Sequence, residues 1–388
     1  MTLKEGTAMG TDEPTTLERT RLSRRALLKT GGAVVGSVGA ASVLAACRGA
    51  GVAAWTPMPS PTSRIAMAPK ASPIVAEVAP SAMPMASPST AASGMPMASA
   101  APADVANARQ PSPPDFAVPP PYRPASSAPI PFDLTSNDGP GEVLIINANP
   151  LTTYRSMNFG RQVPAPTLRV TEGQMVRFTL TNAGQMPHSI DFHAAQCAWS
   201  KNYQEIAPGA SASFDWTASY PGVFMYHCGA APVLMHMADG MYGAVIVDPK
   251  SGRPAAREYL IVQSEFYGAG GEYTKMLTDP PDVVTFNGQA FRYKTTPLTA
   301  KVGELVRIFI VNAGPNSSSA FHVIGALFHH VEADGNPANV EGMRQTIDVP
   351  PGDGALVELR FAEPGSYPFV THKFADATKG AVGVFKVE

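Results

Sequence analysis

The chain has 388 residues, of which 15% are charged, and its formal net charge is −2. At about 150 residues per domain, this length predicts two folded domains and a further part that does not fold. The absence of a basic excess argues against a nucleic-acid partner, and three cysteines provide no even-numbered disulfide framework.

The N-terminus is typical of an export signal. Residues 21–47 have a basic start, an apolar Gly/Ala-rich run and a small-residue end, which differs from a membrane-spanning helix. The run SRRALLK resembles a twin-arginine signal. The run LAAC, which ends at Cys47, resembles the lipobox of bacterial lipoproteins; a chance LAAC in an ordinary signal is the alternative. We therefore predict a signal over residues 1–47 and an exported, periplasmic or cell-surface lipoprotein anchored to a membrane through Cys47.

Residues 48–131 are rich in Ala, Pro, Ser and Met, with few charged and few aromatic residues. Such a segment cannot bury enough apolar area to offset the entropy of ordering it, so we predict a disordered tether. Met-Pro pairs recur in it, beginning with Met58 and Pro59. Because thioethers favour Cu(I), copper gathering is one interpretation of these pairs, and low-complexity drift is the other.

The remaining sequence contains two copies of one unit, which we place at residues 132–250 and 251–388. Each copy consists of short alternating runs rich in Val, Phe and Ile, separated by Gly, Pro and Asn turns. That spacing predicts an all-β chain with a β-sandwich in each half. Matching segments include VTEGQMVR with KVGELVR, TNAG with VNAG, APG with PPG, and GAV in both copies.

A ligand-rich loop ends the first copy, in the run YHCGAAPVLMHMADGMYG. Cys228, His236 and Met241 fall within fourteen residues there. With a second imidazole from His188, they make the ligand set of a blue-type copper, which has two His and one Cys in a plane and a weak axial Met. The alternative, that each residue fills the core or the surface, fits a single such residue better than three.

Strand parity predicts a second cluster behind the first. Neighbouring side chains of a strand point to opposite faces, so His227 points out of the sandwich if Cys228 points in. If the stretch from His188 to His193 is extended, His188 faces the same way as Cys228. Asp191 and His193 then face outward with His227.

Aligning the copies places His227 opposite His372 and Cys228 opposite Lys373. The second copy thus lacks the thiolate and keeps the histidine, so His372 is expected to point outward from the second domain. Three imidazoles, from His193, His227 and His372, suit a second copper with an open position for water or a small anion. The covalent link between His227 and Cys228 would connect the two coppers.

These motifs resemble the copper-containing nitrite reductases, enzymes with two cupredoxin domains that reduce nitrite to nitric oxide. The similarity runs from about residue 159 to residue 388, through PHSIDFHAA, PGVFMYHC and YPFVTHKFADATKGAVG. The resemblance implies two tandem cupredoxin-like Greek-key β-sandwiches after the tether, with two coppers per chain. It implies type 1 copper on His188, Cys228, His236 and Met241, and type 2 copper on His193, His227 and His372.

The resemblance also implies a catalytic pair, Asp191 and His322, and Ile324 as the residue that packs over the substrate. It implies a homotrimer in which a neighbouring subunit donates His372, and a redox donor protein, a cytochrome c or a small cupredoxin. The N-terminus looks like that of the outer-membrane lipoprotein members. The departures from the family are Thr371, where many relatives have Asp, together with Cys197, His329 and His330.

Two alternative functions are weighed against this one. A laccase-like multicopper oxidase needs several His-X-His pairs for its trinuclear cluster, and the sequence contains none. An electron-transfer or copper-handling lipoprotein needs only the blue site. Asp191, His193, His322 and His372 argue against that second alternative, because an electron carrier requires none of them.

Overall fold

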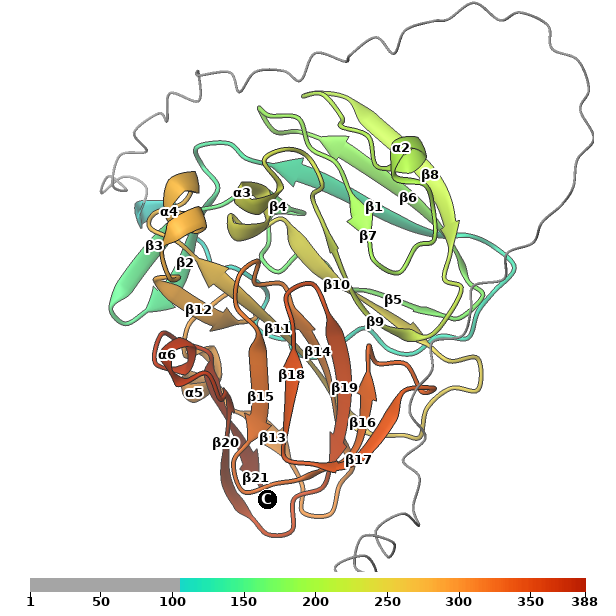
Figure 1. Ribbon diagram of the computed structural model, residues 1–388, viewed down its shortest axis with the longest axis vertical. Coiled ribbons are helices and arrows are strands. Elements are labelled where there is room, and N and C mark those ends of the chain that lie inside the picture. The colour runs from blue at the N-terminus through green and yellow to red at the C-terminus, as the bar shows by residue number, and fades with distance from the viewer. Residues whose placement is uncertain (1–104) are drawn as a thin grey trace, which may run out of the picture. The chain divides into compact units, whose positions relative to one another are not determined.

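The computed structural model describes residues 105–388 (Figure 1). The predicted export signal, Cys47 and the tether up to residue 104 lie outside these residues. Within the described part of the chain, no helix is both long enough and apolar enough to cross a membrane.

The first domain is a sandwich of two four-stranded sheets, with strand orders β4-β1-β6-β8 and β5-β10-β9-β7. Its strands are β1 (Ile130–Asn137), β4 (Asn158–Phe159), β5 (Leu168–Thr171), β6 (Met175–Asn182), β7 (Asp191–Phe192), β8 (Ser211–Thr217), β9 (Gly222–His227) and β10 (Tyr242–Asp248). In β6 the side chains of Val176, Phe178 and Leu180 are buried between the sheets, while Met175 and Arg177 face solvent. This alternation is that of a strand with one face on a core.

The second domain repeats the architecture with six-stranded and five-stranded sheets, in the orders β12-β11-β14-β19-β16-β17 and β13-β21-β20-β15-β18. The strands of the larger sheet are β11 (Arg257–Phe266), β12 (Val283–Phe286), β14 (Val306–Asn312), β16 (Phe328–Ala333), β17 (Val340–Arg344) and β19 (Gly354–Leu359). Those of the smaller sheet are β13 (Leu298–Ala300), β15 (Ser319–Val323), β18 (Thr346–Val349), β20 (Gly365–Thr371) and β21 (Val382–Val387).

Short elements connect and flank the sandwiches. They are the hairpin β2 (Val143–Ala148) and β3 (Leu151–Arg155), and the helices α2 (Trp199–Asn202), α3 (Val233–Ala238), α4 (Tyr273–Thr278), α5 (Arg292–Thr295) and α6 (Phe374–Ala377). Helix α3 follows β9, and helix α6 follows β20, the strand that pairs with β21 much as β9 pairs with β10. The prediction of two tandem cupredoxin-like sandwiches is confirmed, and the predicted boundary at residue 250 falls between β10 and β11.

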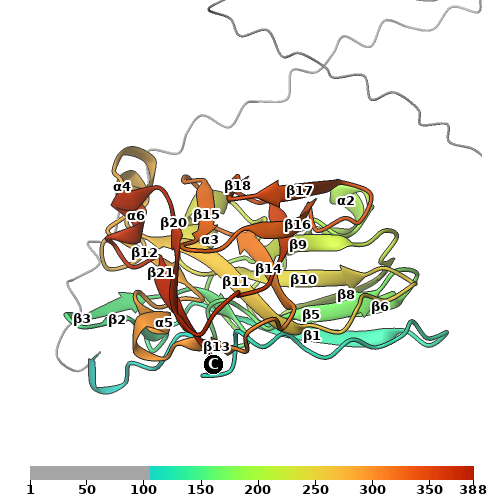
Figure 2. The ribbon, with the colours of Figure 1, turned by 90° about the horizontal axis from the view of Figure 1, so that it is seen from below.

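A third apolar core lies between the two domains. Every residue of β9 and β10 is buried, because one face of these strands lines the first sandwich and the other lies against the second domain. Val223 and Met225 of β9 pack there with Leu260 and Val262 of β11. Figure 2 shows β9 and β10 next to β11 and β14. Strands buried on both faces carry near-continuous apolar runs, which explains the sequence GVFMY in β9.

Part of the predicted tether packs against the folded domains. Phe116 joins the shared core, and Ala117 accepts a 2.7 Å hydrogen bond from the backbone N–H of Leu260. The guanidinium of Arg292 donates to Ser112 Oγ at 2.5 Å. The packed part of the chain thus begins ahead of the boundary predicted at residue 131. The average composition of the segment does not reveal that single residues such as Phe116 find a place in the core.

A buried ion network joins the domains, and it predicts a stability effect. Arg169 of β5 binds Asp248 at 2.7 Å and Glu258 of β11 at 2.6 Å. Arg169→Met would leave the Asp248 carboxylate, which is 1% exposed, without its bidentate partner. Of the described cations, only Arg253 Nε, 3.8 Å from Asp248 Oδ1, would remain beside this carboxylate. We expect a loss of about 3–5 kcal/mol in the free energy of unfolding, because a buried carboxylate that loses its hydrogen-bonded partner is costly. Denaturant titration measures this loss.

The matched control is Arg177→Met. Arg177 forms the same kind of bidentate pair with Asp215, but both side chains are solvent-exposed. Exposed pairs contribute about 0–1 kcal/mol, so this variant should unfold near the wild-type midpoint. Equal effects of the two substitutions would contradict the assigned role of the buried network.

Candidate metal centres

Three predicted ligands lie together inside the first domain. One atom each of His188, Cys228 and His236 lies within 4.8 Å of the others. Cys228 Sγ is 3.1 Å from His236 Nδ1 and 3.8 Å from His188 Nδ1. All three residues are fully buried. With Met241, which is buried in the same apolar core as Cys228, they form a group that we call the thiol cluster.

The loop that carries the thiol cluster is closed by backbone hydrogen bonds. The N–H of Cys228, just after β9, donates to the carbonyl of Met241 at 3.0 Å. The N–H of Met241 donates to the carbonyl of His236 on α3, also at 3.0 Å. His188 approaches from another segment, which bridges to Ile206. Three ligand types from one loop and a fourth residue from a neighbouring strand end are therefore brought to one point.

A carboxylate that the sequence analysis missed orients His188. Asp138 Oδ2 lies 3.1 Å from His188 Nε2, which leaves Nδ1 facing the thiol. Asp138 also accepts hydrogen bonds from the N–H groups of Gln185 and Met186. Partners of this kind fix the tautomer and ring orientation of a metal-binding histidine. The only sequence signal was an acidic residue directly after β1.

The donor types of the thiol cluster suit a soft cation. Burial raises the pKa of the Cys228 thiol to about 11, so this thiol has to release its proton when a metal binds. Burial and the neighbouring His188 lower the pKa of His236 to about 4, so that its imidazole is neutral at pH 7, the form that binds metals. The His236 Nε2 atom is buried without a partner. One sulfur and two imidazole nitrogens with a nearby thioether are the donors that copper prefers, so the residues present fit a copper ion.

A second group lies on the other face of β9. Asp191, His193 and His227 each bring one ligand atom within 4.8 Å of the others, and we call them the imidazole cluster. The rings of His193 and His227 are 5.2 Å apart, and Asp191 Oδ2 is 3.8 Å from His227 Nε2. His227 Nδ1 lies 2.9 Å from the carbonyl of Cys228, so Nε2 is the nitrogen available to a metal.

The histidines predicted on the second domain do not join the imidazole cluster of the same chain within 4.8 Å. Over residues 105–388, no group of three or more metal-binding side chains within 4.8 Å includes His372. Its ring lies 5.6 Å from that of His322 and 4.7 Å from that of Phe374. His322 Nδ1 is 2.5 Å from the carbonyl of Gln345. Ile324 is exposed beside this pair on the chain.

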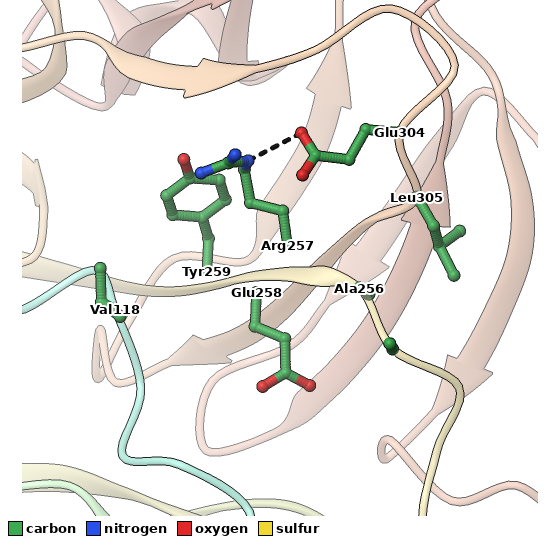
Figure 3. Close-up of a pocket in the computed structure, with 8 residues that line it drawn as sticks. Val118, Ala256, Arg257, Glu258, Tyr259, Glu304 and Leu305 are labelled. Carbon is green, nitrogen blue, oxygen red and sulfur yellow. Dashed lines mark hydrogen bonds and ion pairs between the residues drawn. The ribbon is translucent and has the colours of Figure 1, made fainter.

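A surface cleft of about 530 Å³ on the second domain is unrelated to either cluster (Figure 3). Val118, Tyr259 and Leu305 are among its lining residues. Its charged side chains include Arg257 and Glu304, which pair with each other at 2.8 Å. No histidine, cysteine or methionine lines it. The cleft therefore offers no imidazole or sulfur ligand, and the candidate metal centres are the two clusters beside β9.

Comparison with known proteins identifies the family. Models of the multicopper oxidase family match residues 144–252 and 269–388. The chain is 40% identical over 250 residues to the copper-containing nitrite reductase of Neisseria meningitidis serogroup A. The aligned region covers 61% of this chain and 64% of that relative. It is 34% identical over 269 residues to the copper-containing nitrite reductase of Alcaligenes xylosoxydans xylosoxydans, covering 61% of this chain and 81% of that relative. The chain belongs to the copper-containing nitrite reductases.

The solved structure of the copper nitrite reductase from Nitrosomonas europaea agrees, with a TM-score of 0.64 and 37% identity. The match covers 67% of this chain and 94% of that structure. The chain spans 64% of the length of the Neisseria relatives. The resemblance predicted from the motifs is thus confirmed, and copper is the metal that the names of these relatives carry.

For this nitrite reductase family member, backbone contacts correct the predicted alignment of the two domains. In the first domain the N–H of Cys228 donates to the carbonyl of Met241; in the second, the N–H of Thr371 donates to the carbonyl of Ala381 at 3.2 Å. In each domain this bond lies one residue beyond the last pair of the two strands, which is Tyr242 with His227 in the first domain and Val382 with Val370 in the second. Thr371, and not Lys373, therefore occupies the position of Cys228.

A second pair of contacts leads to the same equivalence. The N–H of Ser189 points to Cys228 Sγ at 3.4 Å, and the N–H of Ala320 donates to Thr371 Oγ1 at 3.1 Å. Each sulfur or oxygen accepts from the neighbouring strand at the same point of the fold.

Val370 is therefore the counterpart of His227. His372 lies two residues further along the chain and does not correspond to a ligand of the first domain. Matching histidine to histidine had moved the alignment by two residues. Because side chains on a strand alternate with a period of two, a shift of two leaves the pattern of buried and exposed residues unchanged. The apolar pattern could not reveal the error.

The corrected registers also relate the two predicted catalytic residues. Asp191 lies where β7 pairs with β9, and His322 lies at the same point of β15, where that strand pairs with β20. The next alternate position carries His193 in the first domain and Ile324 in the second. The position of His188 belongs in the second domain to Ser319, which pairs with Val349 as His188 bridges to Ile206.

Proposed function

We propose that this chain reduces nitrite by one electron to nitric oxide and water, consuming two protons. The observation that carries the proposal is the back-to-back arrangement of two different ligand clusters on the adjacent residues His227 and Cys228. Family membership supports it. The proposed type 1 ligands are His188, Cys228, His236 and Met241, and the proposed type 2 ligands are His193, His227 and His372.

Copper at the two clusters would supply a one-electron relay and a Lewis acid that binds nitrite. The thiol cluster is buried and closed, which suits electron transfer without ligand exchange. The imidazole cluster has an exposed member, His193, which suits a position open to a small anion. The main chain between Cys228 and His227 makes the connection from one cluster to the other covalent.

A type 2 site shared between subunits is supported by the absence of His372 from the imidazole cluster, since over residues 105–388 no group of ligand atoms within 4.8 Å includes it. His193 and His372 are both exposed, so each can meet a neighbouring subunit. Head-to-tail association brings the face of one subunit to the complementary face of the next and closes into a ring. We propose that this ring is a homotrimer and that the neighbouring subunit provides His372.

The protons come from Asp191 and His322. The Asp191 side chain is 35% exposed, and its Oδ2 lies 3.8 Å from His227 Nε2, so the carboxylate reaches the solvent side of the imidazole cluster. His322 is held through Nδ1 by the carbonyl of Gln345, which leaves Nε2 free to pass a proton. A histidine ring can accept a proton on one nitrogen and release it from the other, which suits this role. Ile324, beside His322, would pack over the substrate.

The electron donor is proposed to be a cytochrome c or a small cupredoxin. The chain would act outside the cytoplasm, held to a membrane by a lipid on Cys47. An anaerobic assay of purified protein tests the function: a reduced dye provides electrons, and nitric oxide is measured from nitrite. Oxygen consumption with a laccase substrate and no nitric oxide would instead favour a multicopper oxidase.

Asp191→Asn tests the proton donor. The amide keeps the shape of the side chain and removes its ionisable proton, so we expect nitrite turnover to fall by roughly 100-fold or more, the range of a general acid-base residue. Both coppers should stay bound. The steady-state rate of nitric oxide production, measured between pH 5 and 8, gives the effect.

Asp133→Asn, a change at an exposed position of β1, is the control and should keep wild-type turnover. Near wild-type rates of Asp191→Asn over the whole pH range would refute the role of Asp191.

A further inference from the structure

The second domain has a polar cluster at the position that the thiol cluster holds in the first. Thr371 takes the place of Cys228, as described above. Asp376 on α6 takes the place of His236, because its carbonyl accepts from the N–H of Ala381 at 3.3 Å, as the carbonyl of His236 accepts from that of Met241. Ala381 thus stands where the thioether would be.

The remaining two positions follow in the same way. Ser319 stands at the position of His188, and its Oγ is buried without a hydrogen-bond partner. Glu265, near the end of β11, stands at the position that Asp138 has after β1. It accepts from the N–H of Ser317 at 2.6 Å, as Asp138 accepts from that of Met186. Every donor at these positions is an oxygen. We call Ser319, Thr371, Asp376 and Glu265 the oxygen cluster.

A lysine ammonium lies at the edge of the oxygen cluster. Lys373 Nζ is 3.1 Å from Asp376 Oδ2, so the two side chains form an ion pair, although the angles are not those of a hydrogen bond. The same ammonium donates to Ser317 Oγ, on the segment that leads into β15. The Asp376 side chain is 2% exposed, whereas that of Lys373 is 49% exposed. The cation therefore joins the loop after β20 to the beginning of β15 from the solvent side.

The two domains thus close the same loop by different means. In the first domain a cation bound by the thiol cluster would join the loop from Cys228 to Met241 to the strand end at His188. In the second domain the ammonium of Lys373 makes the corresponding connection. His372 immediately precedes Lys373, and its N–H donates to the carbonyl of Ala320 at 2.6 Å.

We propose that Lys373 and Asp376 are positioning residues that hold His372 in the orientation required by the type 2 copper. This inference rests on the proposed function, in which His372 is a type 2 ligand. The ion pair fixes the main chain on the C-terminal side of His372, and the hydrogen bond to Ala320 fixes its own amide. A ligand held on both sides needs no further ordering when it meets the metal, which favours binding.

Lys373→Met tests the proposal, because methionine keeps a long side chain and removes the charge. We expect type 2 copper to bind about tenfold more weakly, in the range of about 10–100-fold for partners that orient metal ligands. The measurement is loss of the type 2 signal in electron paramagnetic resonance during titration with a copper chelator. The type 1 absorbance should be unchanged, because the thiol cluster lies in the other domain.

Lys373→Arg keeps a cation and should restore most of the type 2 affinity. Asp376→Asn removes the other charge with little change of shape and should weaken type 2 binding as Lys373→Met does. Lys386→Met is the matched control: Lys386 donates to Ser366 Oγ at 2.7 Å on the same domain, away from His372. It should leave both copper signals unchanged.

Wild-type type 2 affinity in both Lys373→Met and Asp376→Asn would overturn the inference. So would equal loss of type 1 and type 2 copper, which would show a general effect on folding. If Lys373→Met does not fold, Asp376→Asn and Lys373→Arg decide the matter. A wild-type protein that binds type 1 copper and no type 2 copper would instead refute the proposed function itself, a result distinct from failure of the positioning role.

Discussion

Replacing Cys228 by alanine should remove the blue or green colour completely, while type 2 copper stays bound. The colour of a cysteine-ligated copper comes from charge transfer from thiolate to metal, and Cys228 Sγ lies between the Nδ1 atoms of His188 and His236. Visible absorption measures the loss. Copper content should fall from two per chain to one, with the type 2 signal retained in electron paramagnetic resonance.

Cys197→Ala is the matched control for this experiment. Cys197 is the other free cysteine among residues 105–388, and it is half-buried near the surface of the same domain. Its removal should leave the colour and both coppers unchanged. A coloured Cys228→Ala protein, or a colourless Cys197→Ala protein, would show that the type 1 ligand assignment is wrong.

Two inactive variants should restore each other's activity when they assemble together. His193→Ala and His372→Ala each remove one type 2 ligand, so each protein alone should show no nitrite reduction above background. In mixed rings, some interfaces pair an intact imidazole cluster with an intact His372. Random assembly gives that combination at about a quarter of the interfaces, since each of two neighbouring subunits must be of the right kind.

The experiment uses co-expression of the variants with different tags and purification on both tags in turn, which removes rings of a single variant and raises the intact fraction to about one third of the interfaces in a ring of three. Nitric oxide production per chain, compared with the wild type, measures the recovered fraction. If each chain built its own type 2 site, every site in the mixture would lack one ligand. No activity above that of the separate variants would then appear.

The thiol cluster could be predicted from sequence because three of its members share one loop. The spacing of Cys228, His236 and Met241 is a property of the chain, and it is unaffected by how the sheets pack. Strand parity then placed His227 behind Cys228, since alternation is a local rule. His188, from a separate segment, followed from the ligand type that was still missing.

Features that depend on contacts between distant segments escaped prediction. Asp138 is one acidic residue among many in the sequence, and only the fold brings it to His188 Nε2. The equivalence of Thr371 with Cys228 was missed because a shift by two residues keeps the same faces buried. The packing of Phe116 was missed because disorder was inferred from average composition, whereas burial is decided residue by residue.

The burial of β9 on both faces holds the two ligand clusters at one spacing. This strand lies between the core of the first domain and the core shared with the second. It ends at His227, and Cys228 follows directly. Neither domain can rotate against the other without disrupting the packing on both faces of β9. The spacing of the thiol and imidazole clusters is therefore fixed by covalent geometry and dense packing, so coppers bound there, as proposed, would keep one separation throughout turnover.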